Sequence, residues 1–402
     1  MAITVLVGSQ YGDEGKGKMV DYLAKDVDFV SRFQGGDNAG HTVINDYGIF
    51  KMHIVPCGVF TPGVINLIGT GTVVNPDSLI EELDAIEAAG VDTSLLYLSE
   101  RAHLILPYHL ELDAAMEENG GIGTTKRGVG QAYAFKILRK NPRAGDLRDL
   151  DELERIIDSA KVAGLAPNLN YDIPREKLET WAKRLVPMLV DPLEMVHAQI
   201  DGGKNLMFEG QLALLKDIDL GIYPYVTGSH TTAAYAAVSG GFSPKLISRI
   251  IGVVKAFTSA VGDGSFPTEM SDAESVPLRG TGENPDDEYG ARTGRSRRLG
   301  WLDIPSLKFA TKINGFDALA LTKMDKLDEL REIKVCTHYT TDSTEPVYKI
   351  FKGWLSDTSK CRTYAELPSE AKDYVEFIES ELNVPIRYIG NGPARADVID
   401  RM

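Results

Sequence analysis

The chain has 402 residues and a formal net charge of −15, with 43% hydrophobic and 25% charged residues. This composition is typical of a globular protein with a large core, and the negative charge disfavours non-specific binding to nucleic acids. The 3 cysteines are widely spaced, which argues against a disulfide framework or a zinc motif, and no apolar run is long enough to span a bilayer. Because the N-terminus also lacks a secretory signal pattern, we expect a cytoplasmic protein that binds neither membrane nor nucleic acid.

Short runs of β-forming residues alternate with amphipathic segments, which predicts an α/β fold with a mainly parallel central sheet and helices on both faces. The expected strands cover residues 3–7, 29–33, 64–68, 95–98, 206–208, 250–256, 318–322, 333–337 and 385–389. The expected helices cover residues 19–24, 76–89, 149–163, 175–200, 304–311 and 368–382. We expect one domain over residues 1–402, with a mostly helical insertion at about 149–202.

The segment Gly8-Ser-Gln-Tyr-Gly-Asp-Glu-Gly-Lys-Gly-Lys18 follows the first strand and leads into the first helix. A glycine-rich turn with lysines before a helix suits a nucleotide phosphate, although such a turn is also compatible with a solvated loop. Its glycines are spaced two residues wider than in the usual P-loop, and Gly17 follows Lys16 where Ser or Thr normally holds Mg²⁺. Asp13 and Glu14 are costly inside a phosphate loop unless they bind a metal or move a proton.

The segment Gln34-Gly-Gly-Asp-Asn-Ala-Gly-His-Thr42 follows the second expected strand. A single histidine is usually structural, but here Gly40 permits close backbone approach, Asn38 offers an amide and His41 is a charge-tunable donor. We expect this set to complete a phosphate and Mg²⁺ site that begins at Asp13.

The segment Gly123-Thr-Thr-Lys-Arg-Gly-Val-Gly130 combines two hydroxyls, two cations and three glycines. It predicts a second phosphate cradle, and the alternative is a surface loop whose threonines cap a helix.

The loop Gly290-Ala-Arg-Thr-Gly-Arg-Ser-Arg-Arg-Leu-Gly300 holds four arginines within seven residues. Arginine forks bind carboxylates and phosphates, so the loop suits a small polyanion. A localisation signal or a solvated charge run is the alternative, but such runs are normally rich in lysine.

The segment Leu321-Thr-Lys-Met-Asp325 ends an apolar strand and resembles the guanine-binding element of GTP-binding proteins. In that element the carboxylate accepts hydrogens from guanine N1 and N2, and the lysine lies along the ring.

Taken in order, these loops resemble those of the adenylosuccinate synthetase family. The matching segments run from Val7 to Pro393 and include GDEGKGK, QGG-NAGHT, IGTT-RGVG, R-GDL, FEG, DID-G-YPYVT, FPTE, TGR-RR-GWLD, LTKMD and GP-R. The family joins the amine of aspartate to C6 of IMP while GTP is hydrolysed to GDP and phosphate. The resemblance therefore implies a Mg²⁺-dependent ligase of AMP biosynthesis.

The resemblance also implies roles for individual residues. Asp13 would take the N1 proton of IMP so that O6 attacks the γ-phosphoryl group of GTP, and His41 would donate to the developing charge. Mg²⁺ would be held by Asp13 and the Gly40 carbonyl. Arg143 matches an arginine that the family takes from a second subunit, so a homodimer is expected.

The binding sets implied by the resemblance are larger. For GTP they are Gly12, Asp13, Glu14, Gly15, Lys16, Gly17, Lys18, Gly40, His41, Thr42, Arg297, Lys323, Met324, Asp325, Gly390, Asn391 and Gly392. For IMP they are Asp13, Asn38, Ala39, Gly40, His41, Thr124, Thr125, Arg143, Gln211, Leu212, Thr227 and Arg295. For L-aspartate they are Arg292, Thr293, Gly294, Arg295 and Arg297.

The chain departs from the family pattern near the base and aspartate positions. The family usually has Glu-Gly-Ala-Gln-Gly where this chain has Glu209-Gly-Gln-Leu-Ala213, and counting back from Asp217 places Leu212 at the glutamine. Gln211 can replace it only if the loop shifts by one residue. Ser296, Arg292 and Asp37 also differ from the usual residues.

These departures bear on the identity of the purine more than on the type of reaction. Adenylosuccinate synthesis from IMP is the leading hypothesis, and it has three alternatives. A relative that ligates aspartate to a guanine nucleotide, (d)GMP, is the nearest alternative, although the retained Asp13 favours IMP. A GTP-dependent switch without ligase activity needs neither the arginine loop nor His41, and the wide phosphate loop disfavours it. A purely structural protein is least expected, because glycine-rich anion loops serve no packing need.

Overall fold

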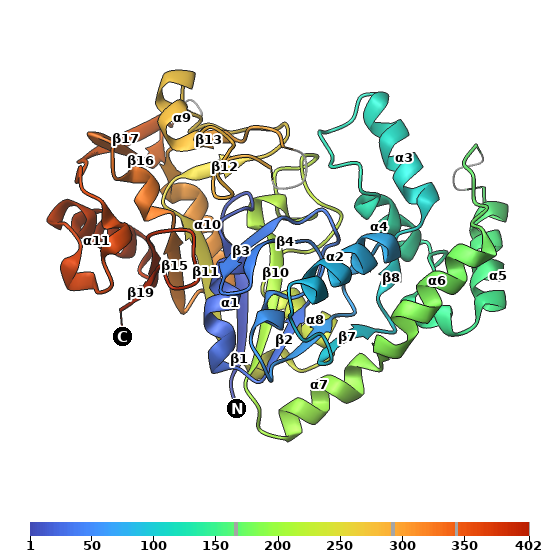
Figure 1. The fold of residues 1–402 in the computed structure, drawn as a ribbon. Coiled ribbons are helices and arrows are strands. Elements are labelled where there is room, and N and C mark those ends of the chain that lie inside the picture. The colour runs from blue at the N-terminus through green and yellow to red at the C-terminus, as the bar shows by residue number, and fades with distance from the viewer. Residues whose placement is uncertain (165–167, 291–293, 342–344, 402) are drawn as a thin grey trace.

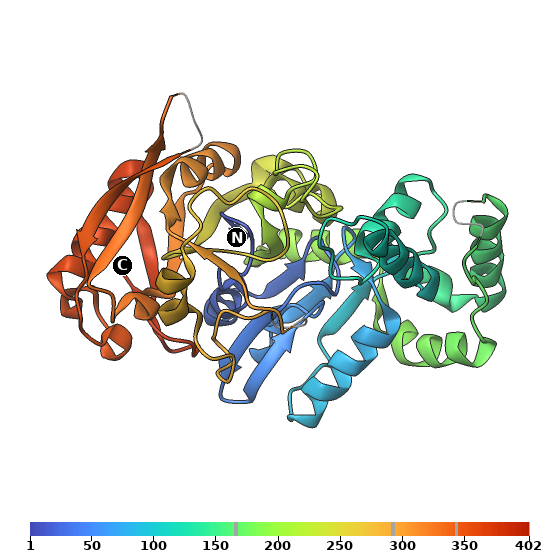
Figure 2. The same cartoon turned by 90° about the horizontal axis from the view of Figure 1, so that it is seen from above.

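The computed structural model describes residues 1–164, 168–290, 294–341 and 345–401. Within these ranges, the centre of the molecule is a ten-stranded sheet in the order β19-β18-β15-β11-β1-β10-β2-β5-β7-β9 (Figures 1 and 2). Its strands are β1 (Ile3–Gly8), β2 (Phe29–Arg32), β5 (Ile65–Ile68), β7 (Leu96–Ser99), β9 (Leu189–Val190), β10 (Leu206–Ala213), β11 (Ile247–Lys255), β15 (Ala318–Thr322), β18 (Ile386–Gly390) and β19 (Val398–Asp400). Only β19 runs antiparallel to its neighbour among the described strands of this sheet, which confirms the mainly parallel α/β fold.

Strand β1 lies in the middle of the sheet because it is apolar on both faces. Val5 is opposite Phe208 of β10 on one side and Ile250 of β11 on the other. Val5 and Val7 belong to one buried apolar cluster, whereas Leu6 belongs to a second cluster. A parallel strand covered by helices on both faces requires this continuous apolar composition.

Helices cover both faces of the sheet, as the sequence predicted. One apolar cluster contains residues of α1 (Lys16–Leu23), α2 (Pro76–Ala88), α5 (Leu150–Val162) and α6 (Arg175–Leu185). The other contains residues of α7 (Pro192–Asp201), α8 (Ala234–Gly240), α10 (Ile304–Asn314) and α11 (Ser369–Leu382). The described helices α3 (Pro107–Glu118), α4 (Val129–Ile137) and α9 (Asp272–Arg279) complete the set. These three helices and α8 were not predicted.

The single helix predicted over residues 175–200 is wrong. Helix α6 ends at Leu185, β9 follows as the edge strand of the sheet, and α7 begins at Pro192. Proline lacks the amide that an interior helical position needs, and the Asp191 side chain caps α7 by accepting from two of its first amides. Because β9 pairs with β7, this stretch also contributes to the central sheet. A separate helical subdomain at 149–202 stays a prediction.

The strand predicted at residues 333–337 forms, but in a second sheet. Here β16 (Glu332–Tyr339) lies between β14 (Leu302–Asp303) and the antiparallel β17 (Pro346–Lys352). The hairpin of β3 (His41–Asn45) and β4 (Gly48–Met52) was not predicted, and neither were the short strands β6 (Val73–Val74), β8 (His103–Leu104), β12 (Thr258–Ala260) and β13 (Arg298–Gly300).

The loops that carry the sequence motifs gather at one edge of the sheet. Strands β2, β10, β1, β11, β15 and β18 are mutually parallel, so their C-terminal ends open at this edge, opposite the N-terminus of the chain (Figure 1). Open parallel sheets bind ligands beyond these ends. None of the described helices has the length and apolar character to cross a bilayer.

We predict that His109 on α3 makes the stability of the fold sensitive to acid. Its Nδ1 accepts from the Leu106 amide at 2.9 Å, and burial lowers the pKa of His109 to about 3. Between pH 6.5 and 4 only the unfolded chain gains this proton, so the free energy of unfolding should fall as the pH falls. His109→Gln keeps an acceptor without titrating, and should flatten this decline by up to roughly 3 kcal/mol in urea unfolding.

His338→Gln, at an exposed position, provides a matched control for the replacement of a histidine by glutamine. An unchanged slope in the His109 variant would contradict the prediction.

Candidate active site

The first glycine-rich loop connects β1 to α1 through left-handed backbone. Gly12 and Gly15 have φ values of 108° and 92°, and Asp13 has 59°. Gly15 is the N-cap of α1, so the unpaired amides of the first helical turn lie beside the loop. The predicted arrangement of strand, glycine turn and helix N-terminus is present.

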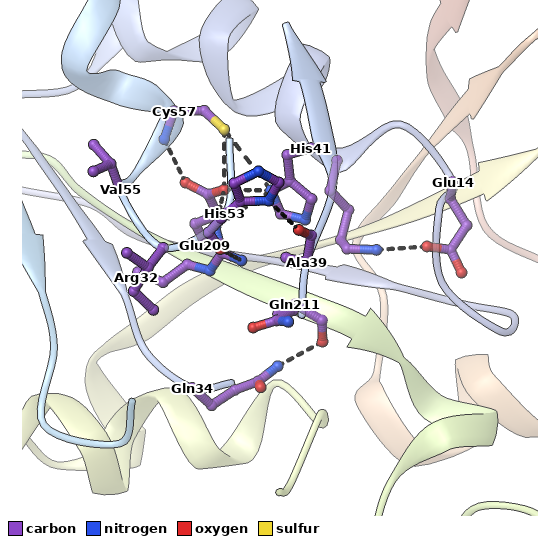
Figure 3. Close-up of polar contacts among 12 residues, drawn as sticks. Glu14, Arg32, Gln34, Ala39, His41, His53, Val55, Cys57, Glu209 and Gln211 are labelled. Carbon is purple, nitrogen blue, oxygen red and sulfur yellow. Dashed lines mark hydrogen bonds and ion pairs between the residues drawn. The ribbon is translucent and has the colours of Figure 1, made fainter. Parts of the chain in front are cut away.

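Glu14 has a role that the sequence argument did not include. Its carboxylate, seen in Figure 3, accepts from the amides of Gln10 at 3.1 Å and Gly12 at 2.9 Å. It also pairs with Lys16 Nζ at 2.6 Å. All of these groups are buried. Glu14 is thus an internal anion that shapes the loop. Asp13, the other acid of this loop, lines the cavities described below.

Asp13 is held as a carboxylate by the surrounding cations. Its Oδ2 lies 2.9 Å from Arg297 Nε, and a quarter of its side chain is exposed. Burial alone would raise the pKa of Asp13, but the charges of Arg297 and Lys255 outweigh it and hold the pKa below its usual range. At neutral pH Asp13 is therefore ionised and can accept a hydrogen bond or ligate a cation.

Two adjoining cavities open beyond the strand ends, and Asp13, Gly40 and Gly290 line both of them. The first has a volume of about 490 Å³, and the second has about 650 Å³. The first is lined by the predicted GTP residues Gly15, Lys16, Gly17, Lys18, His41, Thr42, Arg297, Lys323 and Gly392, and by Gly294 of the predicted aspartate set. The second is lined by Gly12 and by the predicted IMP residues Asn38, Thr124, Thr125, Leu212 and Thr227.

Several predicted residues lie outside both cavity linings. Arg143 and Arg295 are exposed and line neither cavity, and Arg292 and Thr293 fall outside the described residues. The remaining ones, which are buried or half-buried behind the walls, are Glu14, Ala39, Gln211, Met324, Asp325, Gly390 and Asn391.

Lys18 joins α1 to the loop that follows β18. Its Nζ donates to the carbonyl oxygens of Gly392 at 2.5 Å and Asp397 at 2.6 Å. Lys323, which begins the turn after β15, has a left-handed φ of 61° and donates to the Asp286 carbonyl at 2.5 Å. These bonds hold the C-terminal loops around one end of the first cavity.

Leu212, not Gln211, lines the second cavity. The Gln211 side chain is buried and donates to Asn38 Oδ1. The backbone carbonyl of Gln211 accepts from Gln34 at 2.6 Å (Figure 3). A bulge in β10 causes this arrangement. Leu6 and Gly8 of β1, two positions apart, pair with Glu209 and Ala213 of β10, which are four positions apart. Gln211 therefore reaches the cavity only through Asn38.

His41 is oriented by a buried carboxylate. Its Nδ1 lies 2.8 Å from Glu209 Oε1, and Arg32 Nη1 lies 3.2 Å from the same oxygen (Figure 3). Burial would raise the pKa of Glu209, but the bond from His41 and the charge of Arg32 lower it below its usual value, so Glu209 can only accept. The neutral ring therefore carries its proton on Nδ1, which leaves Nε2 unprotonated. Burial, with Arg32, lowers the pKa of His41 to about 4.

The cluster of His41, Cys57 and Glu209 has ligand atoms within 4.8 Å of one another, but it is poorly suited to a metal. Arg32 already neutralises the carboxylate, and a second cation there would be repelled. Burial raises the pKa of Cys57, so its thiol stays protonated and donates to Glu209 at 3.2 Å. The cluster is better explained as a support for His41.

Sequence reasoning missed the buried charges behind the cavities. Arg32 and Glu209 are register partners on β2 and β10, and Lys255 ends the apolar strand β11. A charged residue within or at the end of an apolar strand is a signal that could have singled them out. Glu288 and Gly290 lie beside the arginines of the same loop, and the arginine pattern gave no signal for them.

Comparison with known proteins agrees with this geometry. Residues 5–399 match the adenylosuccinate synthetase family. The chain belongs to this family. It is 49% identical over 429 residues to adenylosuccinate synthetase 1 of Methanosarcina acetivorans, with 100% of both chains covered. Members of the family are ligases that form a C–N bond in purine nucleotide biosynthesis.

Solved structures agree with the fold. The structure of fully ligated adenylosuccinate synthetase from Plasmodium falciparum is 35% identical and superimposes with a TM-score of 0.90 over 100% of both chains. Succinoaminodeoxyadenylate synthetase of cyanophage S-2L, bound to dGMP and dATP, has a TM-score of 0.66 at 20% identity, with 99% of this chain and 95% of that chain covered. At that identity the second likeness extends to the fold alone.

We predict that Gly8→Ala disrupts the phosphate loop. A Cβ at this position would lie 2.4 Å from Glu14 Oε2 and 2.5 Å from the Leu212 carbonyl oxygen. The backbone oxygen cannot move freely, so overpacking should lower the free energy of unfolding by about 1–3 kcal/mol and weaken nucleotide binding. Urea unfolding and calorimetry with GTP measure both effects.

The neighbouring Ser9→Ala is the control for this variant. Ser9 already carries a Cβ, and its buried hydroxyl has no hydrogen-bond partner among the described residues. Wild-type stability and GTP affinity in the Gly8 variant would refute the close contact.

Proposed function

We propose that this protein ligates L-aspartate to C6 of IMP through a 6-phosphoryl-IMP intermediate, which yields adenylosuccinate, GDP and phosphate. The observation that carries the proposal is the position of Asp13. It lies on the wall shared by a cavity with a phosphate loop and a cavity lined by hydroxyl and amide donors. Transfer of a phosphoryl group between two nucleotides needs such a shared wall.

The first cavity suits GTP. Lys16 and the amides of the glycine-rich loop favour its phosphates, and Lys323 lies at the opposite loop. Asp325 Oδ1 is buried and has no hydrogen-bond partner among the described residues, and burial raises the pKa of Asp325. The N1 and N2 hydrogens of guanine would satisfy this carboxylate. Adenine offers an acceptor at N1, so the same site disfavours ATP.

The second cavity suits a purine monophosphate. Asn38, Thr125 and Thr227 supply neutral donors for a 5′-phosphate, and Leu212 offers an apolar surface for a base. Thr124 donates from its hydroxyl to Asp113 at 3.1 Å, which holds the threonine loop against α3.

Asp13 is positioned to begin the chemistry. As an ionised carboxylate it would take the N1 proton, and the O6–P bond would form as the bond between the β and γ phosphates of GTP breaks. The aspartate amine would then attack C6, and phosphate would leave with O6. The Asp13 carboxylate and the Gly40 carbonyl are hard oxygen donors that fit Mg²⁺, which would neutralise charge on the transferring phosphoryl group.

His41 would act through Nε2, because Nδ1 is bonded to Glu209. In the neutral ring Nε2 has no proton to donate. The arrival of an anionic phosphoryl group favours the protonated ring, which would then donate to the developing charge.

The aspartate carboxylates would be bound by the arginine loop, through Gly294, Arg295 and Arg297 together with Arg292 and Thr293. Arg297 lines the first cavity and already pairs with Asp13. Its guanidinium fork suits a carboxylate at the junction of the two cavities.

A homodimer would complete the site with Arg143. This side chain is exposed and lines neither cavity of its own chain, which supports contact with a nucleotide phosphate from a second copy. Ile137 and Leu138, close before it in the chain, are 72% and 52% exposed, and they offer apolar surface for such an interface.

A second candidate function keeps the reaction and changes the purine. Leu212 replaces the family glutamine at the cavity wall, which leaves a guanine nucleotide as the alternative substrate. The retained Asp13 favours IMP.

A substrate panel tests the proposed function. With GTP, Mg²⁺ and aspartate, we expect phosphate release and adenylosuccinate formation with IMP, and at least 100-fold lower kcat/KM with GMP or dGMP. Replacement of GTP by ATP should lower kcat/KM at least tenfold, because adenine leaves Asp325 unpaired. Turnover with only a guanine nucleotide would establish the alternative, and no turnover with either would refute the ligase.

Mixing of an inactive and an impaired variant, assayed at an IMP concentration at which neither variant alone turns over measurably, tests the shared site. Asp13→Ala should abolish turnover, and Arg143→Leu should raise the KM for IMP at least tenfold. A mixture should recover up to roughly a quarter of the wild-type rate, because random hybrids contain one intact site. Mixing Asp13→Ala with Asp13→Asn is the control and should recover nothing. Failure of the first mixture to exceed this control would exclude donation of Arg143 between subunits.

A further inference from the structure

A buried group of charges lies behind the wall that the two cavities share, and its centre is Glu288. The Glu288 carboxylate is fully buried and lies 2.8 Å from Lys255 Nζ, 2.9 Å from Arg297 Nη1 and 3.5 Å from Lys323 Nζ. Lys255 ends β11, Lys323 follows β15, and Arg297 comes from the arginine loop. One carboxylate thus contacts three parts of the site.

The charges in this group do not cancel. Lys255, Lys323 and Arg297 carry three positive charges, and Glu288 and Asp13 carry two negative ones, which leaves one positive charge in excess. Burial would raise the pKa of Glu288, but its three cations hold the pKa well below the usual value. A buried ionic group of this kind adds little net stability, whereas an excess positive charge complements an incoming phosphoryl anion.

Glu288 also anchors the loop that carries the arginines. The backbone carbonyl of Glu288 accepts from the Arg297 amide at 2.9 Å, and the Glu288 amide donates to the backbone carbonyl of Arg279 at 2.8 Å. Tyr289 and Ser296 form a bridge immediately inside that contact. The loop between them contains Gly290, on the wall of both cavities, and Gly294, on the wall of the first.

In this arrangement Arg297 forms an ion pair with Asp13. Its Nε pairs with Asp13 Oδ2, which is an oxygen that a purine N1 proton or a cation would need. Arg297 must therefore leave Asp13 when the substrates bind, while its Nη1 still has Glu288 as a partner. Lys255 fixes Glu288 from behind and also bonds to Ser259, which lines the second cavity.

We propose that Glu288, held by Lys255, is a positioning residue that sets Arg297 for aspartate and Lys323 for the nucleobase of GTP. This inference rests on the proposed function, because it assigns those two ligands to the two cations. It predicts that the loss of one carboxylate weakens GTP and aspartate together and leaves IMP, which is bound by other groups, unaffected.

Glu288→Gln tests the inference by the pattern of its effects. We expect the KM for aspartate and the Kd for GTP, from calorimetry, each to rise at least tenfold, while the KM for IMP stays within threefold of wild type. The exposed Glu283→Gln in the same loop is the matched control and should change none of them. A general loosening of the structure would raise all three constants alike, and that outcome, or no change, would overturn the proposal.

The double variant Glu288→Gln/Lys255→Met keeps the test decisive if the single variant fails to fold. It removes one charge of each sign, so the net charge of the group is that of the wild type. We expect a wild-type melting temperature within about 5 °C, with the same tenfold losses for aspartate and GTP. Constants within threefold of wild type would refute the role of Glu288. Absence of adenylosuccinate formation by the wild type would refute the proposed function instead, and calorimetry with GTP would still test Glu288.

Discussion

The register of β1 between its two parallel neighbours controls where the chemistry of this protein lies. Val5 is fixed opposite Phe208 and Ile250, and apolar clusters bury the strand on both faces. A slip of β1 by one residue would turn the side chains of each face of the strand toward the apolar cluster on the opposite face. The register of β1 is therefore strongly determined. The loop with Asp13 begins where this strand ends, and five neighbouring loops begin at the same edge. The geometry of both cavities therefore follows from the packing of the core.

The acids of the site differ in how completely they are neutralised. Glu14 is satisfied by Lys16 and two loop amides, and Glu288 by three cations. Asp13 has one close partner, Arg297, and that partner is shared with Glu288. Among these acids, Asp13 is thus the one whose partner a substrate or a cation can replace most readily. A chain of net charge −15 can offer a site for anions here because local cations outnumber the acids that face them.

Groups that are left incomplete lie on or behind the walls of the two cavities. Asp325 has an oxygen without a hydrogen-bond partner among the described residues, which suits the two donors of guanine. At the second cavity, the bulge of β10 turns Gln211 toward Asn38 and places Leu212 on the wall. Membership of the adenylosuccinate synthetase family agrees with a ligase reaction that forms a C–N bond. Leu212 on the wall of the second cavity is the local change that bears on the choice of purine.

The sequence by itself determined the alternation of strands and helices, because apolar runs and turn residues are local signals, and it located the loops around Asp13, His41 and Lys323. It was wrong over residues 175–200, where Pro187 and Pro192 end one helix and start another around the edge strand β9. Only the tertiary structure decided that Glu209 orients His41 and that Leu212 lines the second cavity. It also decided that Glu288 joins three loops. These contacts join residues far apart in the chain, such as Arg32 and Glu209, which are 177 positions apart. Their pairing depends on strand order and a bulge, and neither leaves a periodic trace in the sequence.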